Sequence, residues 1–234
     1  MKSFQLKSLA AVVLATLAFS AAQAQQVRVT EAAPYASGNT PFKADWFELT
    51  NTSSTTITLS GWKMDDNSNA FASSVPLAGI SSIAPGESVI YIECAAGCAA
   101  IAGFQSYWGS PVAGVQIGTY SGSGVGLSTS GDAVNIFDSA GAVLTRVDFG
   151  ASTAGRTFDN AAGLDNVTLT TLSTVGVNGA FNSAQSLTAG GAPTGVFDMG
   201  SPGSIAAAVP EPSTYALIAA GLLVIGGLTR RRQR

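Results

Sequence analysis

Apolar residues between positions 25 and 208 recur in short alternating runs, and nowhere do they keep a 3.6-residue spacing over twelve positions. The runs are rich in β-branched and aromatic residues, and clusters of Gly, Pro, Asn and Ser separate them. This pattern predicts strands at 26–31, 45–51, 55–59, 62–65, 88–93, 133–138 and 143–149. Strands of this length and spacing predict an all-β domain made of two packed antiparallel sheets.

Alternation along each predicted strand assigns its two faces. In the run from Trp46 to Thr50, Phe47 and Leu49 point one way, while Trp46, Glu48 and Thr50 point the other. Applied to every run, alternation predicts an interior that holds Val29, Phe47, Leu49, Ile57, Leu59, Trp62, Ile83, Val89, Tyr91, Val134, Ile136, Val147 and Phe149. A body of this length can bury that many side chains.

The first 24 residues have the parts of a secretory signal peptide. Lys2 and Lys7 supply the positive start, and positions 9–19 form an apolar run that is too short to span a bilayer. Ala22 and Ala24 form a small-x-small cleavage site. We therefore expect a signal helix that the secretion machinery engages, and a signal peptidase that leaves Gln25 as the new N-terminus.

Positions 209–234 also fall into three parts. Pro210, Glu211 and Pro212 mark a stop, because proline cannot donate a backbone hydrogen bond. Positions 215–228 are apolar and predict a short transmembrane helix; with three flanking residues it spans roughly 25 Å, just short of a hydrocarbon core of about 30 Å. The chain ends in a cluster that is typical of a cytoplasmic flank and consists of Arg230, Arg231, Arg232 and Arg234.

This order of motif, apolar stretch and arginine cluster resembles the PEP-CTERM sorting signal. The resemblance implies that an inner-membrane exosortase recognises the tail and processes the protein for export to the surface or extracellular matrix of a Gram-negative bacterium. Such systems accompany exopolysaccharide production. A plain C-terminal membrane anchor is the alternative. A sorted protein is anchored transiently and loses the tail, whereas an anchored protein keeps it.

Several motifs in the body occur in a recognisable order. They are V-T-E at 29–31, D-W-F-E-L-T-N at 45–51, L-S-G-W at 59–62, I-A-P-G at 83–86, L-S-T-S-G-D-A-V at 127–134, V-D-F-G at 147–150 and S-P-G at 201–203. This ordered set resembles the lamin tail domain, and it implies an immunoglobulin-like antiparallel β-sandwich. The departures are a Gly/Ser-rich insert around 111–126 and a loose stretch at 151–200.

The chain is therefore expected to divide into four parts. A signal peptide occupies 1–24, and the sandwich occupies 25–160, or 25–204 if it includes the closing motif. A loosely structured extension at 161–208 leads to the sorting segment at 209–234.

In physical terms, Gly61 and the Pro85-Gly86 pair suit turns that need a positive φ, and Asp132 suits a turn in which its side chain accepts a backbone amide.

Composition excludes several classes of function. The chain contains no His, so it cannot form a Ser-His-Asp or Cys-His catalytic set, or a His-based zinc site, on its own. Residues 25–208 contain 5 basic and 13 acidic residues, a net charge of −8 that the whole-chain value of −3 conceals. Such a body should stay soluble and repel nucleic acid. We expect no cofactor and no metal.

Paired carboxylates would be the remaining route to catalysis. Asp65 and Asp66 are adjacent, and Asp45 and Glu48 are three positions apart, so the members of each pair face opposite sides of a strand. A retaining glycosidase needs two carboxyl groups about 5–5.5 Å apart. No short-range pair meets that requirement, and the sequence marks no long-range pair.

A calcium loop is the next candidate, because Asp65, Asn67 and Asn69 give the opening D-x-N-x-N. Ala70 and Pro76 stand where an EF-hand needs Gly and a bidentate Glu, so an EF-hand is rejected. A loose calcium site stays as an alternative to a solvated loop. The Gly-Ser cluster at 121–124 has neither the lysine nor the strand-to-helix context of a phosphate-binding loop.

Cys94 and Cys98 are expected to form a local disulfide in an oxidising compartment. Together these features predict a non-enzymatic exported protein, a structural or binding module associated with exopolysaccharide or another surface protein. A carboxylate-dependent hydrolase of extracellular polymer is one alternative, and a tail-anchored envelope protein is another.

Overall fold

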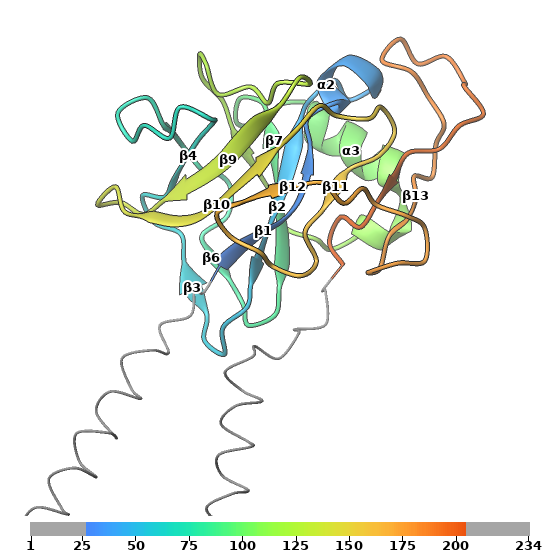
Figure 1. The fold of residues 1–234 in the computed structure, drawn as a ribbon. Helices are drawn as coiled ribbons and strands as arrows, with labels where there is room; N and C mark the ends of the chain where they lie inside the picture. Colours follow the sequence, from blue (N-terminus) through green and yellow to red (C-terminus); the bar gives the residue numbers. More distant parts are fainter. Residues whose placement is uncertain (1–26, 205–234) are drawn as a thin grey trace, which may run out of the picture.

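Two five-stranded sheets pack face to face in the computed structural model, which describes residues 27–204 (Figure 1). This mostly β architecture confirms the expected all-β sandwich. The expected signal helix and the expected transmembrane helix lie outside the described residues. Within the described part, no helix is both long enough and apolar enough to cross a membrane.

Each predicted strand is present, with ends that differ by a few residues. The first sheet consists, in spatial order, of β11 (Phe158–Asp159), β1 (Val27–Ala33), β2 (Trp46–Asn51), β7 (Ser88–Glu93) and β8 (Ile117–Tyr120). The second consists of β12 (Val167–Leu169), β10 (Val143–Phe149), β9 (Asp132–Phe137), β4 (Lys63–Asp65) and β5 (Val75–Pro76). Two small ladders join β3 (Ile57–Thr58) to β6 (Ser82–Ile83) and β13 (Phe181–Asn182) to β14 (Met199–Gly200).

The prediction of purely antiparallel sheets is wrong at two edges. β8 runs parallel to β7, and β12 runs parallel to β10. Parallel neighbours need a crossover connection, and between β7 and β8 the chain makes it through α3 (Ala100–Trp108) and a 3₁₀ turn, η1 (Ser110–Val112). The strand pattern alone did not predict this helix, because nine residues are too few to sustain a helical spacing over twelve positions.

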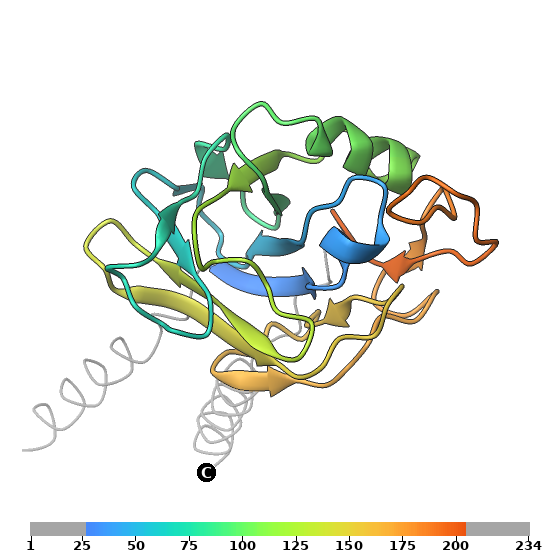
Figure 2. The same ribbon diagram turned by 90° about the horizontal axis from the view of Figure 1, so that it is seen from above.

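The helix α3 covers the outer face of the first sheet and makes a third layer. Figure 2 shows this arrangement: α3 in green on one side of blue β1, and the yellow strands of the second sheet on the other. Trp46 of β2 contacts Phe104 and Trp108 of α3 edge to face, with ring centroids 5.4 and 5.9 Å apart. The short helix α2 (Ala36–Asn39) buries Ala36 in the same cluster. The first sheet is therefore buried on both faces.

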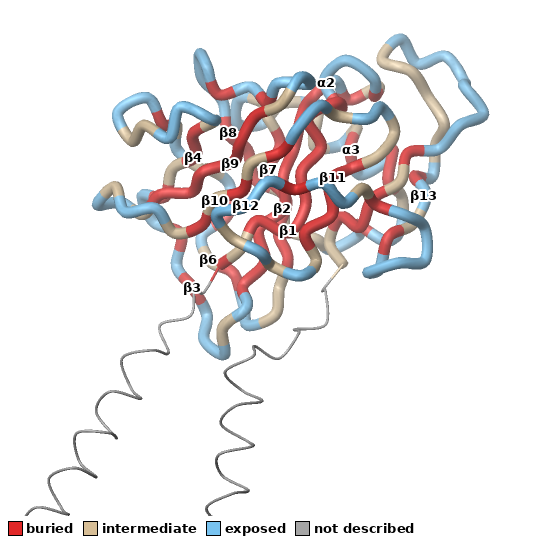
Figure 3. The backbone as a smooth tube through the Cα atoms, in the orientation of Figure 1, coloured by how far each residue is buried: buried red, intermediate tan, exposed pale blue. Residues whose placement is uncertain are grey.

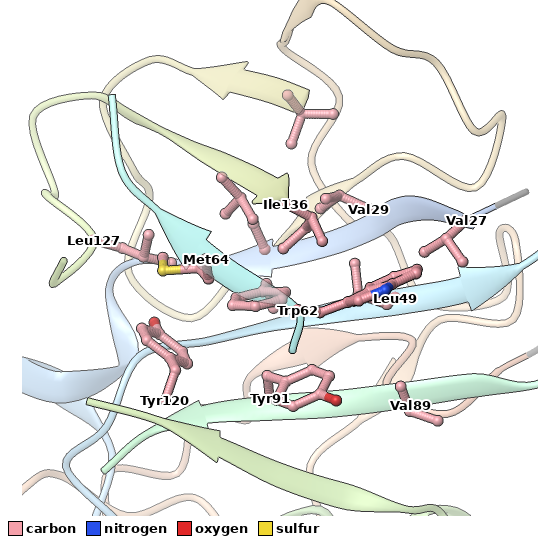
Figure 4. Packing of buried hydrophobic residues seen from close by; sticks show 14 of the residues in the cluster. Val27, Val29, Leu49, Trp62, Met64, Val89, Tyr91, Tyr120, Leu127 and Ile136 are labelled. Carbon is pink, nitrogen blue, oxygen red and sulfur yellow. The ribbon is translucent and has the colours of Figure 1, made fainter. Parts of the chain in front are cut away.

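The main core lies between the two sheets. Every residue that alternation placed in the interior belongs to this cluster, and Figure 4 shows Val29, Leu49, Tyr91 and Ile136 meeting there. Figure 3 shows the same division along the chain, with the strands buried and the connecting loops exposed. Burial of each large side chain contributes roughly 1.5–3 kcal/mol, so this cluster is the main source of stability.

The turns have the geometry that their sequences predict. Gly61 and Gly86 have φ values of 75° and 73°, and the Glu87 amide donates to the Ala84 carbonyl oxygen at 3.0 Å, as a Pro-Gly type II turn requires. Asp132 accepts the Ser128 amide at 2.7 Å and the Ala133 amide at 2.8 Å. These motif residues thus have structural roles.

The stretch from 161 to 204, expected to be a loose extension, is ordered and packs on the sandwich. β12 pairs with β10, and Phe181 of β13 packs on Trp108 with ring centroids 5.7 Å apart. Asn160 Nδ2 donates to the Val29 carbonyl oxygen at 2.7 Å, which ties the start of this stretch to β1. The expectation fails because many of its contacts are hydrogen bonds from loops, which leave no hydrophobic period in the sequence.

Replacing Trp108 by Ala should lower the free energy of unfolding by about 3–5 kcal/mol, because the side chain is 1% exposed and its removal opens a cavity under α3. Phe197, 41% exposed, is the matched control, and Phe197→Ala should cost less than about 0.5 kcal/mol. Urea unfolding of the purified exported protein measures both. Equal costs for the two variants would contradict the assignment of α3 to a buried third layer.

Candidate functional site

A bulge in β1 turns two neighbouring polar side chains toward the outer face of the first sheet. The pairing with β2 shifts between Val29 and Glu31, which leaves Thr30 without a partner residue. Val29 and Ala32 both point into the main core, so Thr30 and Glu31 between them share the opposite face. Strict alternation from Val29 would have sent Glu31 into the hydrophobic core.

The bulge brings two glutamates together on that face. Glu31 stands directly opposite Glu48 of β2, and the two side chains are 0% and 1% exposed. Thr30 Oγ1 donates to Glu48 Oε1 at 2.5 Å, and Thr157 Oγ1 donates to Glu31 Oε1 at 2.5 Å. Hydroxyl groups of Thr50, Ser88 and Ser173 extend this network on either side.

The last described residues of the chain complete the network. The Ser201 amide donates to Glu31 Oε1 at 2.7 Å, and the Gly203 amide donates to Glu48 Oε2 at 2.7 Å. The Ser204 amide donates to the Ser201 carbonyl oxygen at 2.9 Å, so Ser201–Ser204 forms a tight turn, called here the closing turn. Each carboxyl group of the pair thus holds one backbone amide of this turn.

Two glycines let the closing turn approach the carboxyl groups. Gly203 has a φ of 77°, and a Cβ atom there would come within 2.4 Å of Val115 Cγ2. A Cβ atom on Gly200 would come within 2.8 Å of Glu31 Oε1 and 2.9 Å of the Trp108 ring. With Pro202 before Gly203, the sequence S-P-G-S has the residues that a type II turn requires.

Enclosure changes the acidity of these groups. Burial raises the pKa of Glu48 to about 7, although hydrogen bonds from Thr30 and Gly203 oppose the shift. Burial and, next, the proximity of Glu48 raise the pKa of Glu31 well above its ordinary value. Burial also raises the pKa of Asp45, the residue just before β2, to about 7. A carboxyl with a raised pKa is a candidate for acid–base chemistry only if a substrate can reach it.

No substrate path leads to the glutamate pair in residues 27–204, because the chain's own closing turn occupies the space over it. Asp45 and Asp65, one from each acid pair singled out in the sequence, are not exposed to a substrate either. Asp45 is 2% exposed and accepts the Ser37 amide at 2.8 Å and its hydroxyl at 3.1 Å. The geometry of the pair therefore fits a structural latch for the closing turn.

The candidate calcium loop is organised by hydrogen bonds within the loop. The buried carboxyl group of Asp65 accepts the Ser68 hydroxyl at 2.6 Å, the Ala70 amide at 2.7 Å and the Ser73 hydroxyl at 3.1 Å. Among the described residues, no three His, Cys, Asp or Glu side chains come together as metal ligands would.

A small pocket opens on the surface of the segment that begins at β11. It has a volume of about 180 Å³ and lies between β12, the turn after β11 and the loop that contains Asn178. Six polar residues and five apolar residues line it: Asp159, Asn160, Thr168, Thr170, Thr171 and Asn178, together with Ala161, Ala162, Leu164, Val167 and Leu169. Its dimensions suit one small polar group or sugar ring.

The other predicted site residues fall into two groups. Cys94 and Cys98 are bridged, with an S–S distance of 2.03 Å, and their pairing in the exported protein stays a prediction. Ala22, Ala24, the Pro210–Pro212 motif and the terminal arginines lie outside the described residues.

Sequence reasoning missed the glutamate pair and its partner turn. Glu31 was interpreted as an ordinary strand residue and Glu48 was considered only together with Asp45, although both glutamates fall inside apolar runs. The one available signal was the break in alternation along V-R-V-T-E-A-A, which marks the bulge.

Two family models match the chain. The model described as Lamin Tail Domain matches residues 20–151, and the model described as PEP-CTERM protein-sorting motif matches residues 208–233. No curated protein matches the chain. The sequence resemblances to both families are thereby confirmed.

The raised acidities predict how stability depends on pH. A carboxyl whose pKa rises on folding, from 4.5 to about 7 for Glu48, keeps its proton in the folded protein while the unfolded chain has already lost it. The free energy of unfolding should therefore fall as pH rises from about 4.5 to 7, by about 3 kcal/mol for one such group.

Glu48→Gln should flatten this decline and be at least as stable as the wild type at pH 8, since the amide oxygen can still accept the Gly203 amide. Glu87→Gln, in a surface turn, is the control and should keep the wild-type slope. Urea unfolding of each purified protein between pH 5 and pH 8 provides the measurement. A stability that rises with pH over this range would refute the assignment.

Proposed function

The chain belongs to the lamin tail domain family, and from that premise we propose that it is an exported, non-enzymatic protein whose sandwich is a structural or binding module of the cell surface or extracellular matrix. The PEP-CTERM motif implies export, membrane-anchored sorting and recognition by an exosortase in a Gram-negative bacterium. Loss of the tail after sorting, and association with exopolysaccharide, belong to the proposal.

One observation supports the proposal that the protein is not an enzyme. The glutamate pair has the burial and raised pKa values typical of catalytic acids, yet both carboxyl groups hold backbone amides of the closing turn at 2.7 Å. A hydrolase needs its carboxyl groups to reach substrate from a cleft. The pair instead holds the closing turn, which leaves the surface as the part of the molecule that acts.

The pocket between β12 and Asn178 is a candidate for ligand contact. Thr168 and Thr170 are exposed at its wall, and Asp159 Oδ2 accepts Asn178 Nδ2 at 2.9 Å, which fixes one side. Hydroxyl and amide groups can donate to and accept from sugar hydroxyls. The net charge of −8 in residues 25–208 favours a neutral polymer over a polyanionic one.

Thr168→Trp should weaken binding of the purified exported protein to the producing bacterium's exopolysaccharide by about tenfold, because the indole would fill the pocket. Thr58→Trp, on the exposed side of β3 and outside the pocket, is the matched control and should bind like the wild type. Co-sedimentation with the polymer measures all three proteins. Wild-type binding by Thr168→Trp would reject the pocket, and no binding by the wild type would reject the polymer as ligand.

A further inference from the structure

The segment that leads to the sorting motif leaves the sandwich at a fixed point. Ser88 Oγ donates to the Ser204 carbonyl oxygen at 3.4 Å, and Ser204 Oγ donates to the Gly179 carbonyl oxygen at 3.3 Å. Ser88 pairs with Thr50, and next to it Asn51 pairs with Val27. The described chain therefore begins and ends at the same end of the first sheet, on the lower side of the view in Figure 1.

The sorting motif follows this fixed point closely. Only residues 205–209 separate Ser204 from Pro210, and six residue steps reach at most about 21 Å. A folded body of this length has a radius of gyration of about 16 Å, which for a sphere means a diameter of about 41 Å, so the body is about twice as wide as that reach. An enzyme that receives Pro210–Pro212 in its active site must meet the end of the sandwich from which Ser204 leaves.

The loops around Ser204 carry little charge of their own, although Arg156 donates to Thr174 Oγ1 at 2.7 Å and Asp159 accepts Asn178 Nδ2 at 2.9 Å along their border. We define the tail-root face as the loops 52–56, 84–87 and 174–179 together with Ser204. Asn51 connects the first two loops, since its side-chain amide donates to the Thr55 carbonyl oxygen at 2.8 Å and its carbonyl oxygen accepts the Gly86 amide at 2.8 Å. Glu87 is the one charged residue in these loops, although the body carries −8.

The same face presents apolar side chains to solvent. Val175 and Val177 are 47% and 49% exposed in the loop that packs on Ser204. The carboxyl group of Glu87 is held by the Ala84 amide and by Gln116 Nε2, both at 2.7 Å, which turns it back into its own turn. Exposed apolar groups that lie close together are typical of contact surfaces.

We propose that the tail-root face is held against the exposed surface of the membrane-embedded exosortase while the sorting motif occupies that enzyme's active site. This inference rests on the proposed function, in which the tail is recognised and removed. The partner surface that it fits presents apolar and hydroxyl groups. The closing turn determines where the contact forms, because it holds Ser204 against the sandwich. Only five residues, 205–209, then separate Ser204 from the sorting motif.

The test introduces charge on this face and, separately, at the opposite end. Val177→Glu and Ser54→Glu place a carboxylate on the tail-root face. Ser123→Glu is the matched control, because it follows β8 beyond Tyr120, which lies beside Glu93 at the far end of β7. Ser54 and Ser123 are both exposed, so neither change disturbs the core. Thermal unfolding of each purified variant verifies this.

Removal of the tail is followed in the producing bacterium by the intact mass of the full-length and shortened protein over time. Both tail-root variants should slow removal about tenfold, because a carboxylate would be desolvated in the contact, while Ser123→Glu should match the wild type. Ten Gly/Ser residues inserted between positions 207 and 208 should restore the rate of Val177→Glu, since the body can then swing away from the enzyme.

Wild-type rates for Val177→Glu and Ser54→Glu would overturn the contact. So would a Val177→Glu rate that the insertion leaves slow, because the charge would then act at another step. A wild-type protein that keeps residues 205–234 at the cell surface has a different meaning: it would overturn the proposed processing itself. The two failures are therefore distinguishable by the mass of the wild-type protein.

Discussion

Two enclosed carboxyl groups on neighbouring strands are the constraint on which the rest of this structure depends. Glu31 and Glu48 face away from the main core, and each holds one amide of the closing turn. Buried carboxyl groups without hydrogen-bond partners would cost several kcal/mol. The fold supplies backbone amides from residues 201 and 203, more than 150 positions away along the chain, and among the described residues only Glu31 Oε2 of the pair is left buried without a partner. The two ends of the domain are thus joined at one polar site.

This constraint explains why the folded body extends beyond the lamin tail match. The family model covers residues 20–151, whereas the glutamates of β1 and β2 are completed by residues 157 and 199–204. Three features let the closing turn reach the two carboxyl groups. They are the bulge in β1, the lack of space for a side chain at Gly200 and the positive φ of Gly203. The segment between these points carries the pocket and the 174–179 loop of the tail-root face, so the position of both depends on the latch.

The parts of the fold that follow from local pattern were predictable from the sequence. Alternating runs located seven of the strands and thirteen residues that all lie in the core between the sheets, and the turn residues located Gly61, Gly86 and Asp132 correctly. The helix α3 was beyond that reasoning because it is short and lies in a crossover whose existence depends on parallel pairing of β7 and β8. The sequence placed Trp46 and Glu48 on the correct face of β2. It did not show that this face is buried, because the residues that cover it are distant along the chain.

The site was less predictable, for a physical reason. A register shift of one residue decides whether Glu31 meets the core or the closing turn, and no local propensity fixes that shift. The S-P-G motif indicated a turn but not its partners. Loops such as 183–198 lie between weakly patterned segments and are held by backbone hydrogen bonds, so the sequence predicted them as loose.

Amide hydrogen exchange at Ser201 and Gly203 tests the latch most directly. In the exported protein at pH 6, these two amides should exchange as slowly as the Glu48 amide within β2, because opening them requires two carboxyl groups to lose their partners. The Gly190 amide, in an exposed loop, provides the fast reference. Exchange of Ser201 and Gly203 at the rate of Gly190 would contradict the account, since the chain's C-terminal segment would then be only loosely attached to the sandwich.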